Sequence, residues 1–227
     1  MKAAGIITQI EEVDRKRCKV YIDQEYAFTI YKGELTEYKI RVNNPIDDKI
    51  YHMIKTEVLP KRAKKRCLNL LQKRPYTEYK LREKLVEGYY TEDIVDEAIA
   101  YVKSFHYIDD YEYACQYIFY HKESETRRKM EEKLMLKGID RDTLQKAFND
   151  SYTEDEQFQI ELEQAKKLLQ KKKYEPDNAD WKERQKIYSF LVRKCISSAV
   201  IKKAMIYTIC MFFVLTQRYN LYKIELL

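Results

Sequence analysis

One pattern occurs three times in this chain, and a repeat of this kind limits the possible folds more than any other property of a sequence. Each copy has two apolar residues four positions apart, a spacing that places them on one face of a helix. The second copy starts 49 residues after the first (81 to 130), and the third starts 57 residues after the second (130 to 187). The pairs are Leu81 and Leu85, Met130 and Leu134, and Ile187 and Leu191. We therefore expect stacked helical modules, which more often bind a partner than catalyse a reaction.

Each copy also contains a signal for the start of a second helix. Ten residues after the first apolar position stand Thr91, Asp140 and Ser197. Their side-chain oxygens can accept a hydrogen bond from an open backbone N–H at a helix N-terminus. Apolar residues follow three or four positions later, so each copy is predicted to be a helix, a turn and a further helix.

The composition agrees with a helical protein. Among 227 residues there are only 4 Gly and 4 Pro, while charged residues make up 35% and hydrophobic residues 45%. The net charge of +6 is moderately basic and does not by itself require a nucleic-acid partner. The five cysteines are scattered without a C-x-x-C pair, which argues against a disulfide framework or a zinc site and favours a reducing compartment. The N-terminus has no long apolar run, so we expect a cytoplasmic protein with no signal peptide and no role in a membrane.

The N-terminal part has a different periodicity. Residues 6–13 form a predicted strand, and residues 18–22 and 26–30 alternate apolar and polar side chains on either side of a polar break at 23–25. Such alternation predicts an antiparallel hairpin. We expect a small sheet that ends at Asn43–Pro45 and needs a third strand or a helix to cover one face.

Helical patterns fill the rest of the chain. Pro60 is expected to separate a helix over 46–59 from one over 61–74, and the further predicted helices are 77–87, 91–104, 110–121, 125–137, 140–149, 153–172, 181–194 and 197–212. The predicted fold class is mostly α, with three tandem three-helix modules and a small N-terminal antiparallel β extension. The predicted division is 1–45 for the β extension, 46–60 for a connecting helix, 61–108, 109–152 and 153–205 for the three repeats, and 206–227 for an apolar tail. At 204–216 the tail is strongly apolar but shorter than a membrane span, and we favour a buried terminal helix over an interfacial or non-native extension.

These residues resemble the RecX family of recombination regulators. Phe105–Ala114 is similar to the family's most specific segment, in which a hydrophobic residue precedes Tyr-Ile-Asp-Asp and Tyr-Ala follows two positions later. The stretches 82–94, 130–139 and 186–196 resemble its three repeats, and the match covers about 61–204. The N-terminal extension is like that of some Gram-positive members.

The resemblance implies a non-catalytic protein that binds the RecA–DNA filament. Family members restrain RecA ATP hydrolysis, strand exchange and co-protease activity, and so act in recombination, DNA repair and the SOS response. The implied partners are the RecA filament and DNA within or beside it, and the chain is expected to be a monomer without a cofactor.

The chain departs from the family pattern in its helix-ending turns. Where the family usually has Gly, this chain has Gly138 in the second repeat but Tyr89 and Cys195 in the other two. Glycine adopts the left-handed conformation of such turns at no steric cost. We expect Gly88 to serve this purpose one residue earlier in the first repeat, and the third turn to be strained or built differently.

Clusters of basic residues are the candidate contacts with RecA or DNA. A basic helix face can meet phosphates or acidic groups of a protein, and the alternative is an ordinary solvated surface. If successive modules carry such clusters, they can line one side of the repeat array. The candidates are Lys61, Lys64, Lys65, Lys73, Arg74, Arg127, Arg128, Lys129, Lys171, Lys172, Arg193 and Lys194.

Other polar and aromatic residues have simpler interpretations. Asp109 or Asp110 is expected to cap the helix that starts there. Tyrosines around the first repeat can pack between helices or stack on bases, and packing is the favoured interpretation for Tyr76, Tyr79, Tyr89 and Tyr90. The sequence does not decide whether Trp181 anchors its own module or a partner.

Signatures of an enzyme are missing from the sequence. It contains no G-x-x-x-x-G-K-[ST], G-x-G-x-x-G or H-E-x-x-H motif, and none of its three histidines has a triad-like or metal-like neighbour. We therefore expect no catalytic residue, no metal site and no cofactor. The alternatives to a RecA regulator are a stand-alone helical DNA-binding protein and a plain interaction protein.

Overall fold

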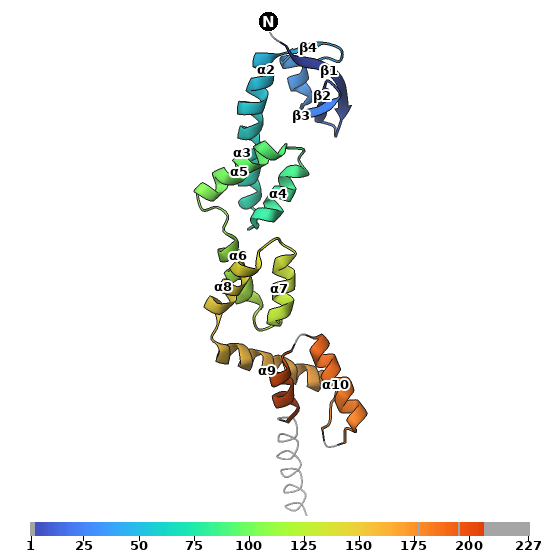
Figure 1. Cartoon of the computed structure of the whole chain (residues 1–227), viewed down its shortest axis with the longest axis vertical. Helices are drawn as coiled ribbons and strands as arrows, with labels where there is room; N and C mark the ends of the chain where they lie inside the picture. The colour runs from blue at the N-terminus through green and yellow to red at the C-terminus, as the bar shows by residue number, and fades with distance from the viewer. Residues whose placement is uncertain (1–2, 177, 195, 207–227) are drawn as a thin grey trace, which may run out of the picture. The chain divides into compact units, whose positions relative to one another are not determined.

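The structure is a computed structural model that describes residues 3–176, 178–194 and 196–206. The chain divides into two compact units, Met1–Tyr113 and Ala114–Leu227, which are described separately. Tandem three-helix modules follow a small antiparallel sheet, as the sequence predicts (Figure 1). Residues 207–227, which are all of the predicted 206–227 apolar tail except its first residue, and Cys195 lie outside the described part. The proposed domain boundaries stay a prediction.

The sheet has four strands in the order β3-β2-β1-β4. These are β1 (Ala3–Glu12), β2 (Arg17–Ile22), β3 (Glu25–Tyr31) and β4 (Pro45–Asp47). All neighbouring strands are antiparallel, with Val20 opposite Ile10 on one side and opposite Phe28 on the other. The predicted hairpin is present, but the sequence did not indicate strand β4 at the Asn43–Pro45 boundary or helix α1 (Lys32–Glu37) before it. Both are short, so neither shows a full period of hydrophobic residues.

Helical backbone runs from α2 (Asp48–Met53) through η1 (Ile54–Val58) into α3 (Leu59–Leu71), and the expected break at Pro60 does not occur. The segment before Pro60 is a π-helix, in which the Leu59 amide donates to the carbonyl of Ile54, five residues back. Proline lacks an amide hydrogen and its ring crowds the preceding helical turn. A wider π turn relieves that crowding, so the proline lies within continuous helix.

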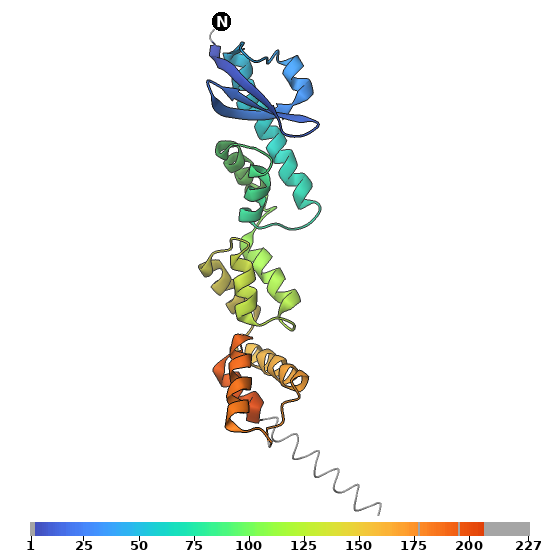
Figure 2. The ribbon, with the colours of Figure 1, turned by 90° about the vertical axis from the view of Figure 1, so that its right-hand side faces the viewer.

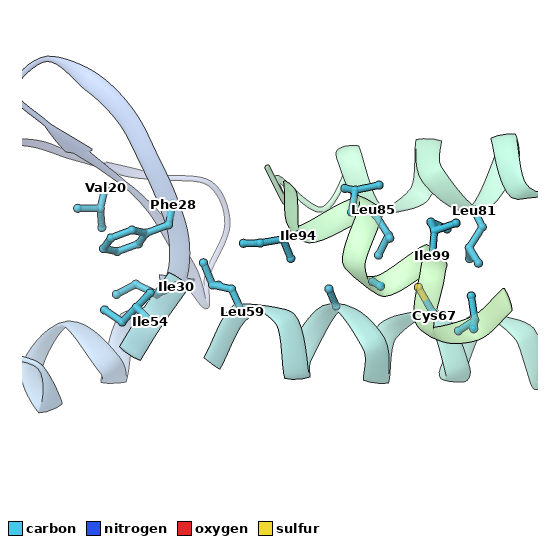
Figure 3. Close-up of a cluster of buried hydrophobic side chains, with 14 of the residues drawn as sticks. Val20, Phe28, Ile30, Ile54, Leu59, Cys67, Leu81, Leu85, Ile94 and Ile99 are labelled. Atoms are coloured by element: carbon cyan, nitrogen blue, oxygen red, sulfur yellow. The ribbon is translucent and has the colours of Figure 1, made fainter. Parts of the chain in front are cut away.

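The first module consists of α3, α4 (Glu78–Val86) and α5 (Glu92–Ser104), and it shares one hydrophobic core with the sheet. Figure 3 shows Val20, Phe28 and Ile30 of the strands facing Ile54 and Leu59 of the long helix. The same core continues along α3 to the contacts among α3, α4 and α5, where Cys67, Leu81, Leu85, Ile94 and Ile99 pack. The sheet is therefore covered by α2, η1 and the start of α3 (Figure 2).

The second and third modules lie in the second unit. The second module is formed by α6 (Asp110–His121), most of which lies in this unit, with α7 (Arg127–Met135) and α8 (Arg141–Ser151). The third contains α9 (Glu154–Lys171), α10 (Trp181–Arg193) and a helix described over 198–206. The third module has its own core, formed by residues such as Leu169, Leu191 and Val200.

The turn after the middle helix is the same in all three modules at the level of hydrogen bonds. The amides of Tyr90, Ile139 and Ile196 donate to the carbonyls five residues earlier, at 3.3, 3.3 and 3.2 Å. The acceptors are Leu85, Leu134 and Leu191, the second apolar residue of each sequence repeat. This six-to-one bond defines the Schellman motif, which ends a helix with a left-handed residue.

The left-handed residue of the first module is Tyr89, with φ 64°, and not Gly88. The expectation that Gly88 provides this conformation was therefore wrong. In the second module Gly138 adopts φ 86°, as the family pattern predicts. Gly88 lies in a close approach instead, because a Cβ there would be 3.0 Å from the Tyr90 ring and 3.0 Å from the Leu85 carbonyl oxygen, which is a tight contact.

The helix starts also follow the prediction. Thr91 and Asp140 are the N-caps of α5 and α8. The Asp140 carboxylate accepts the amide of Thr143 at 2.9 Å, as expected. The Thr91 hydroxyl makes no capping bond and instead accepts from the Lys55 ammonium at 3.2 Å. Asp109 caps α6 by accepting the amides of Tyr111 and Glu112. Asp110 instead accepts the amide of Glu78, the first residue of α4, at 2.8 Å, beside the N-cap Thr77. Burial raises the pKa of Asp110, since this carboxylate is held away from water.

Leu85→Ala should lower the free energy of unfolding by about 2–5 kcal/mol, because the fully buried leucine side chain would leave a cavity. The matched control is Val86→Ala, one residue further along and 60% exposed, which should change stability by less than about 0.5 kcal/mol. Chemical denaturation measures both. Equal effects would mean that the buried face of α4 is assigned incorrectly.

Candidate binding surfaces

Two of the predicted basic residues on α3 are exposed, and a third contributes to packing. Lys61 and Lys65 lie on the side of the helix away from buried Ala63. Lys64 instead forms an ion pair with Glu97 of α5 at 2.7 Å, and its ammonium lies 5.2 Å from the centre of the Tyr101 ring. Lys64 therefore helps to join two helices of the first module.

The turn after α3 contains the next pair. Lys73 and Arg74 are both exposed. The Arg74 guanidinium lies 4.7 Å from the centre of the Tyr76 ring. The Tyr76 side chain is partly buried and packs against the core of the first unit. Tyr76 and Tyr90 are packing residues, whereas Tyr79 and Tyr89 are 47% and 37% exposed.

On α7 the three consecutive basic residues differ in their surroundings. The Arg127 guanidinium donates to Glu131 at 2.8 Å and to Gln157 of α9 at 3.1 Å, and it lies 4.8 Å from the centre of the buried Phe148 ring. Arg128 and Lys129 are exposed and form only longer ion pairs within their own helix region, at 3.4 and 3.7 Å. Exposed pairs of this kind contribute little to stability.

The third module has a basic hollow of about 480 Å³. Its lining includes two of the predicted residues, Lys172 and Arg193, together with Phe190. Lys182 and Lys186 also line it, with Glu183 and Ile187, and the sequence reasoning missed both lysines. Residues 182, 186, 190 and 193 are spaced so that they lie on one face of the helix, and this spacing is the sequence signal that could have identified the two lysines. Lys171 and Lys194 are exposed and adjoin lining residues in the sequence, but they do not line the hollow themselves.

An exposed apolar residue occupies the same position in all three repeats. Val86, Met135 and Val192 are 60%, 43% and 44% exposed, and each directly follows a leucine that is fully buried. The spacing of 49 and 57 residues is that of the repeat itself (86 to 135, 135 to 192). One such residue needs no explanation, but the three equivalent ones give each module the same exposed apolar position.

A lysine is repeated in the same register. Lys80, Lys129 and Lys186 precede the first buried apolar residue of the pair by one position in each copy. Lys80 pairs with Glu83 at 2.7 Å, while Lys129 and Lys186 are exposed. The middle helix of each module thus has a lysine six positions before its exposed apolar side chain.

The remaining residues singled out in the sequence stand in separate surroundings wherever the structure describes them. Trp181 is 72% exposed at the start of α10. His121 stacks on Tyr117 with ring centres 4.0 Å apart. Cys18, Cys67 and Cys115 are free thiols, and burial raises the pKa of Cys67 to about 11. Within residues 3–176, 178–194 and 196–206 there is no group of three metal-ligating side chains and no helix long and apolar enough to span a bilayer.

Arg127→Ala should increase the hydrogen-exchange rate of the α7 and α8 amides about tenfold, because it removes bonds to Glu131 and Gln157 and the contact with Phe148. Arg128→Ala, on the same helix and with the same loss of charge, is the control and should leave these rates nearly unchanged. Identical exchange in the two variants would contradict the structural role of Arg127.

Comparisons with known proteins agree with the repeat pattern. Residues 63–101 match a family model described as the first three-helix domain of RecX, and residues 159–205 match its third three-helix domain. A protein named regulatory protein RecX from Clostridium perfringens is 32% identical over 194 residues, which is 84% of this chain and 90% of the relative. The one from Clostridioides difficile is 27% identical over 205 residues, or 88% of this chain and 94% of the relative.

Two solved structures are similar in fold. A crystal structure of regulatory protein RecX has a TM-score of 0.59 at 24% identity and covers 87% of this chain and 98% of its own. That of RecX from Lactobacillus salivarius has a TM-score of 0.58 at 22% identity and covers 66% of this chain and 97% of its own. The relatives are named as regulatory proteins and not as enzymes.

Proposed function

The chain belongs to the RecX family, and from this premise we propose that it is a non-catalytic regulator of RecA. It binds the RecA–DNA filament and inhibits RecA ATP hydrolysis, strand exchange and co-protease activity in recombination and the SOS response. It acts in the cytoplasm as a monomer, and it needs no cofactor because its effect comes from binding alone.

The observation that carries this proposal is the repeated exposed position at Val86, Met135 and Val192. A filament presents the same surface at regular intervals, so a partner with tandem modules can make the same contact several times. Once one module is bound, the binding of the next is intramolecular, so the overall affinity can be high even when each single contact is weak. The cation at Lys80, Lys129 and Lys186 can add a charged contact to each apolar one.

Val86→Ser, Met135→Ser and Val192→Ser should each weaken inhibition of DNA-stimulated RecA ATP hydrolysis by about fivefold, since each loses roughly 1 kcal/mol of apolar contact. The triple variant should lose on the order of 100-fold, because the contacts act together. Titration of the protein into a RecA ATPase assay measures the inhibitory concentration.

The control for this test is Val42→Ser, which changes a valine that is 45% exposed but lies outside the repeats. It should inhibit like the unmodified protein. The unfolding midpoint of the triple variant should be unchanged, because all three side chains face solvent. A folded triple variant with full inhibition would remove the basis of the proposal.

The basic hollow of the third module favours a second candidate function, which is DNA binding without RecA. Four cations and the Phe190 ring meet there with a single acidic residue, Glu183. Lysine and arginine side chains that contact phosphates release counterions from DNA, so this binding depends steeply on salt.

Lys182→Glu combined with Lys186→Glu should weaken binding to labelled duplex DNA and reduce the slope of log affinity against log salt by about 2. Lys167→Glu combined with Lys202→Glu, also exposed and in the same unit, changes the net charge equally and is the control. Fluorescence anisotropy without RecA measures both. If the two double variants bind equally, the hollow is not a DNA site.

A further inference from the structure

A second basic pocket lies in the first unit, and none of the cations that line it is among the candidate contacts named from the sequence. It has a volume of about 450 Å³ and is formed where the turn between β1 and β2 meets α3 and the turn between α4 and α5. Five cationic side chains line it, and Asp14 is the only acidic one among the lining residues. The cations are Arg15, Lys16, Arg17, Arg62 and Arg66.

The first wall of the pocket is a rigid turn. The Asp14 carboxylate accepts the amides of Lys16 and Arg17, both at 2.8 Å, and the Arg17 guanidinium, also at 2.8 Å. The bond from the Lys16 amide and the ion pair with Arg17 hold the pKa of Asp14 below its usual value, so it stays charged. The Asp14 carboxylate forms its ion pair with Arg17. Arg15 and Lys16 are exposed and have no ion pair among the residues that the structure describes.

Helix α3 provides the opposite wall through two arginines one turn apart. Arg62 pairs with Glu34, and its guanidinium lies 4.4 Å from the centre of the Tyr31 ring. The Nε of Arg66 donates to the carbonyl oxygen of Lys84 at 3.3 Å. Each arginine is therefore held by one edge of its guanidinium, and its other N–H groups have no hydrogen-bond partner in the described part of the chain.

The Tyr90 side chain lies between these walls. Burial raises the pKa of its hydroxyl, while the positive charges of Arg62, Arg66 and Arg17 act in the opposite direction. Three guanidinium groups thus lie near one point in a partly enclosed space. Guanidinium groups bind phosphate oxygens through paired N–H donors, and a lysine ammonium adds a point charge.

Aromatic surface adjoins the cations. Tyr31 and Tyr89 are 42% and 37% exposed, and the Lys19 ammonium lies 4.6 Å from the centre of the Tyr89 ring. Tyr89 has the left-handed backbone of the helix-ending turn, a conformation that costs a tyrosine energy which glycine would avoid. The Tyr26 hydroxyl donates to the Tyr89 carbonyl and fixes the residue against the sheet.

We propose that this pocket binds the backbone phosphates of a single nucleic-acid strand, with Tyr31 and Tyr89 as stacking surfaces for its bases. Positive grooves flanked by exposed aromatic rings are how proteins hold single strands without reading their sequence. The cations occupy two walls, so several anionic groups at regular spacing satisfy them better than one carboxylate does. A free nucleotide has the same phosphate and base chemistry, and the experiment separates the two sources.

The test is anisotropy of a labelled oligothymidylate with the full chain and no RecA, so a failure here leaves the proposed function intact. Arg15→Gln combined with Lys16→Gln should weaken binding on the order of tenfold and lower the salt slope by about 1.4, the value for two phosphate contacts on a single strand. The matched control is Arg41→Gln combined with Lys49→Gln, which removes one exposed arginine and one exposed lysine elsewhere in the same unit. Each pair is also made together with Lys182→Glu and Lys186→Glu, which removes the third-module hollow as a source of binding.

A second variant tests the stacking surface. Tyr89→Asn keeps a residue that tolerates the left-handed backbone but removes the ring, and it should weaken oligothymidylate binding by at least about fivefold. Its unfolding midpoint is measured alongside to show that the turn is intact.

Three outcomes would overturn the proposal. The first is equal weakening by the pocket pair and the control pair, which would mean that overall charge alone attracts the strand. The second is ATP that binds with the same dependence on Arg15 and Lys16 while the oligonucleotide does not, which would assign the pocket to a free nucleotide. The third is a polyglutamate peptide that binds in place of the oligonucleotide, which would assign it to an acidic protein segment.

Discussion

Each of the three modules depends on one leucine near the end of its middle helix. The side chains of Leu85, Leu134 and Leu191 are fully buried, and their carbonyl oxygens accept the hydrogen bond that closes the helix-ending turn. The same leucine thus fills the core with its side chain and closes the end of the helix with its carbonyl oxygen. The position of the core contact therefore also sets the position at which the helix ends. The same constraint turns the next residue outward, and this is why Val86, Met135 and Val192 are exposed at equivalent positions.

The turn itself is made with different residues in different modules. Gly138 takes the left-handed position in the second module without strain, whereas Tyr89 takes it in the first at a cost of about 1 kcal/mol or more. The sheet offsets this cost, because the Tyr26 hydroxyl holds the Tyr89 carbonyl and Lys19 covers its ring. The N-terminal sheet and the first module therefore support each other through both a shared core and this turn.

Charged residues divide into those that hold the modules together and those that are available to a partner. Lys64 and Arg127 stand in basic runs that look alike in the sequence, yet both connect helices through carboxylate or amide partners and aromatic rings. Lys61, Lys65 and Arg128 beside them are exposed. In a protein with 35% charged residues, such ties use many of the cations, and in the described part of the chain the hollows of the first unit and of the third module are two places where several cations gather around few acids.

The sequence by itself determined the repeat, the helices and the hairpin, because these follow from local periodicity and capping chemistry in residues such as Leu85, Asp140 and Val20. The sequence also contains an apolar residue directly after the leucine that is second in each apolar pair, at Val86, Met135 and Val192. Only the structure decided that helix continues through Pro60, that the sheet shares its core with the first module, and that Arg17, Arg62 and Arg66 line one pocket with Tyr90. The shared core and the pocket depend on contacts between residues far apart in the chain, and such contacts leave no periodic signal in the residues that make them. The helix through Pro60 depends instead on a local π turn, an exception to the rule that proline ends a helix.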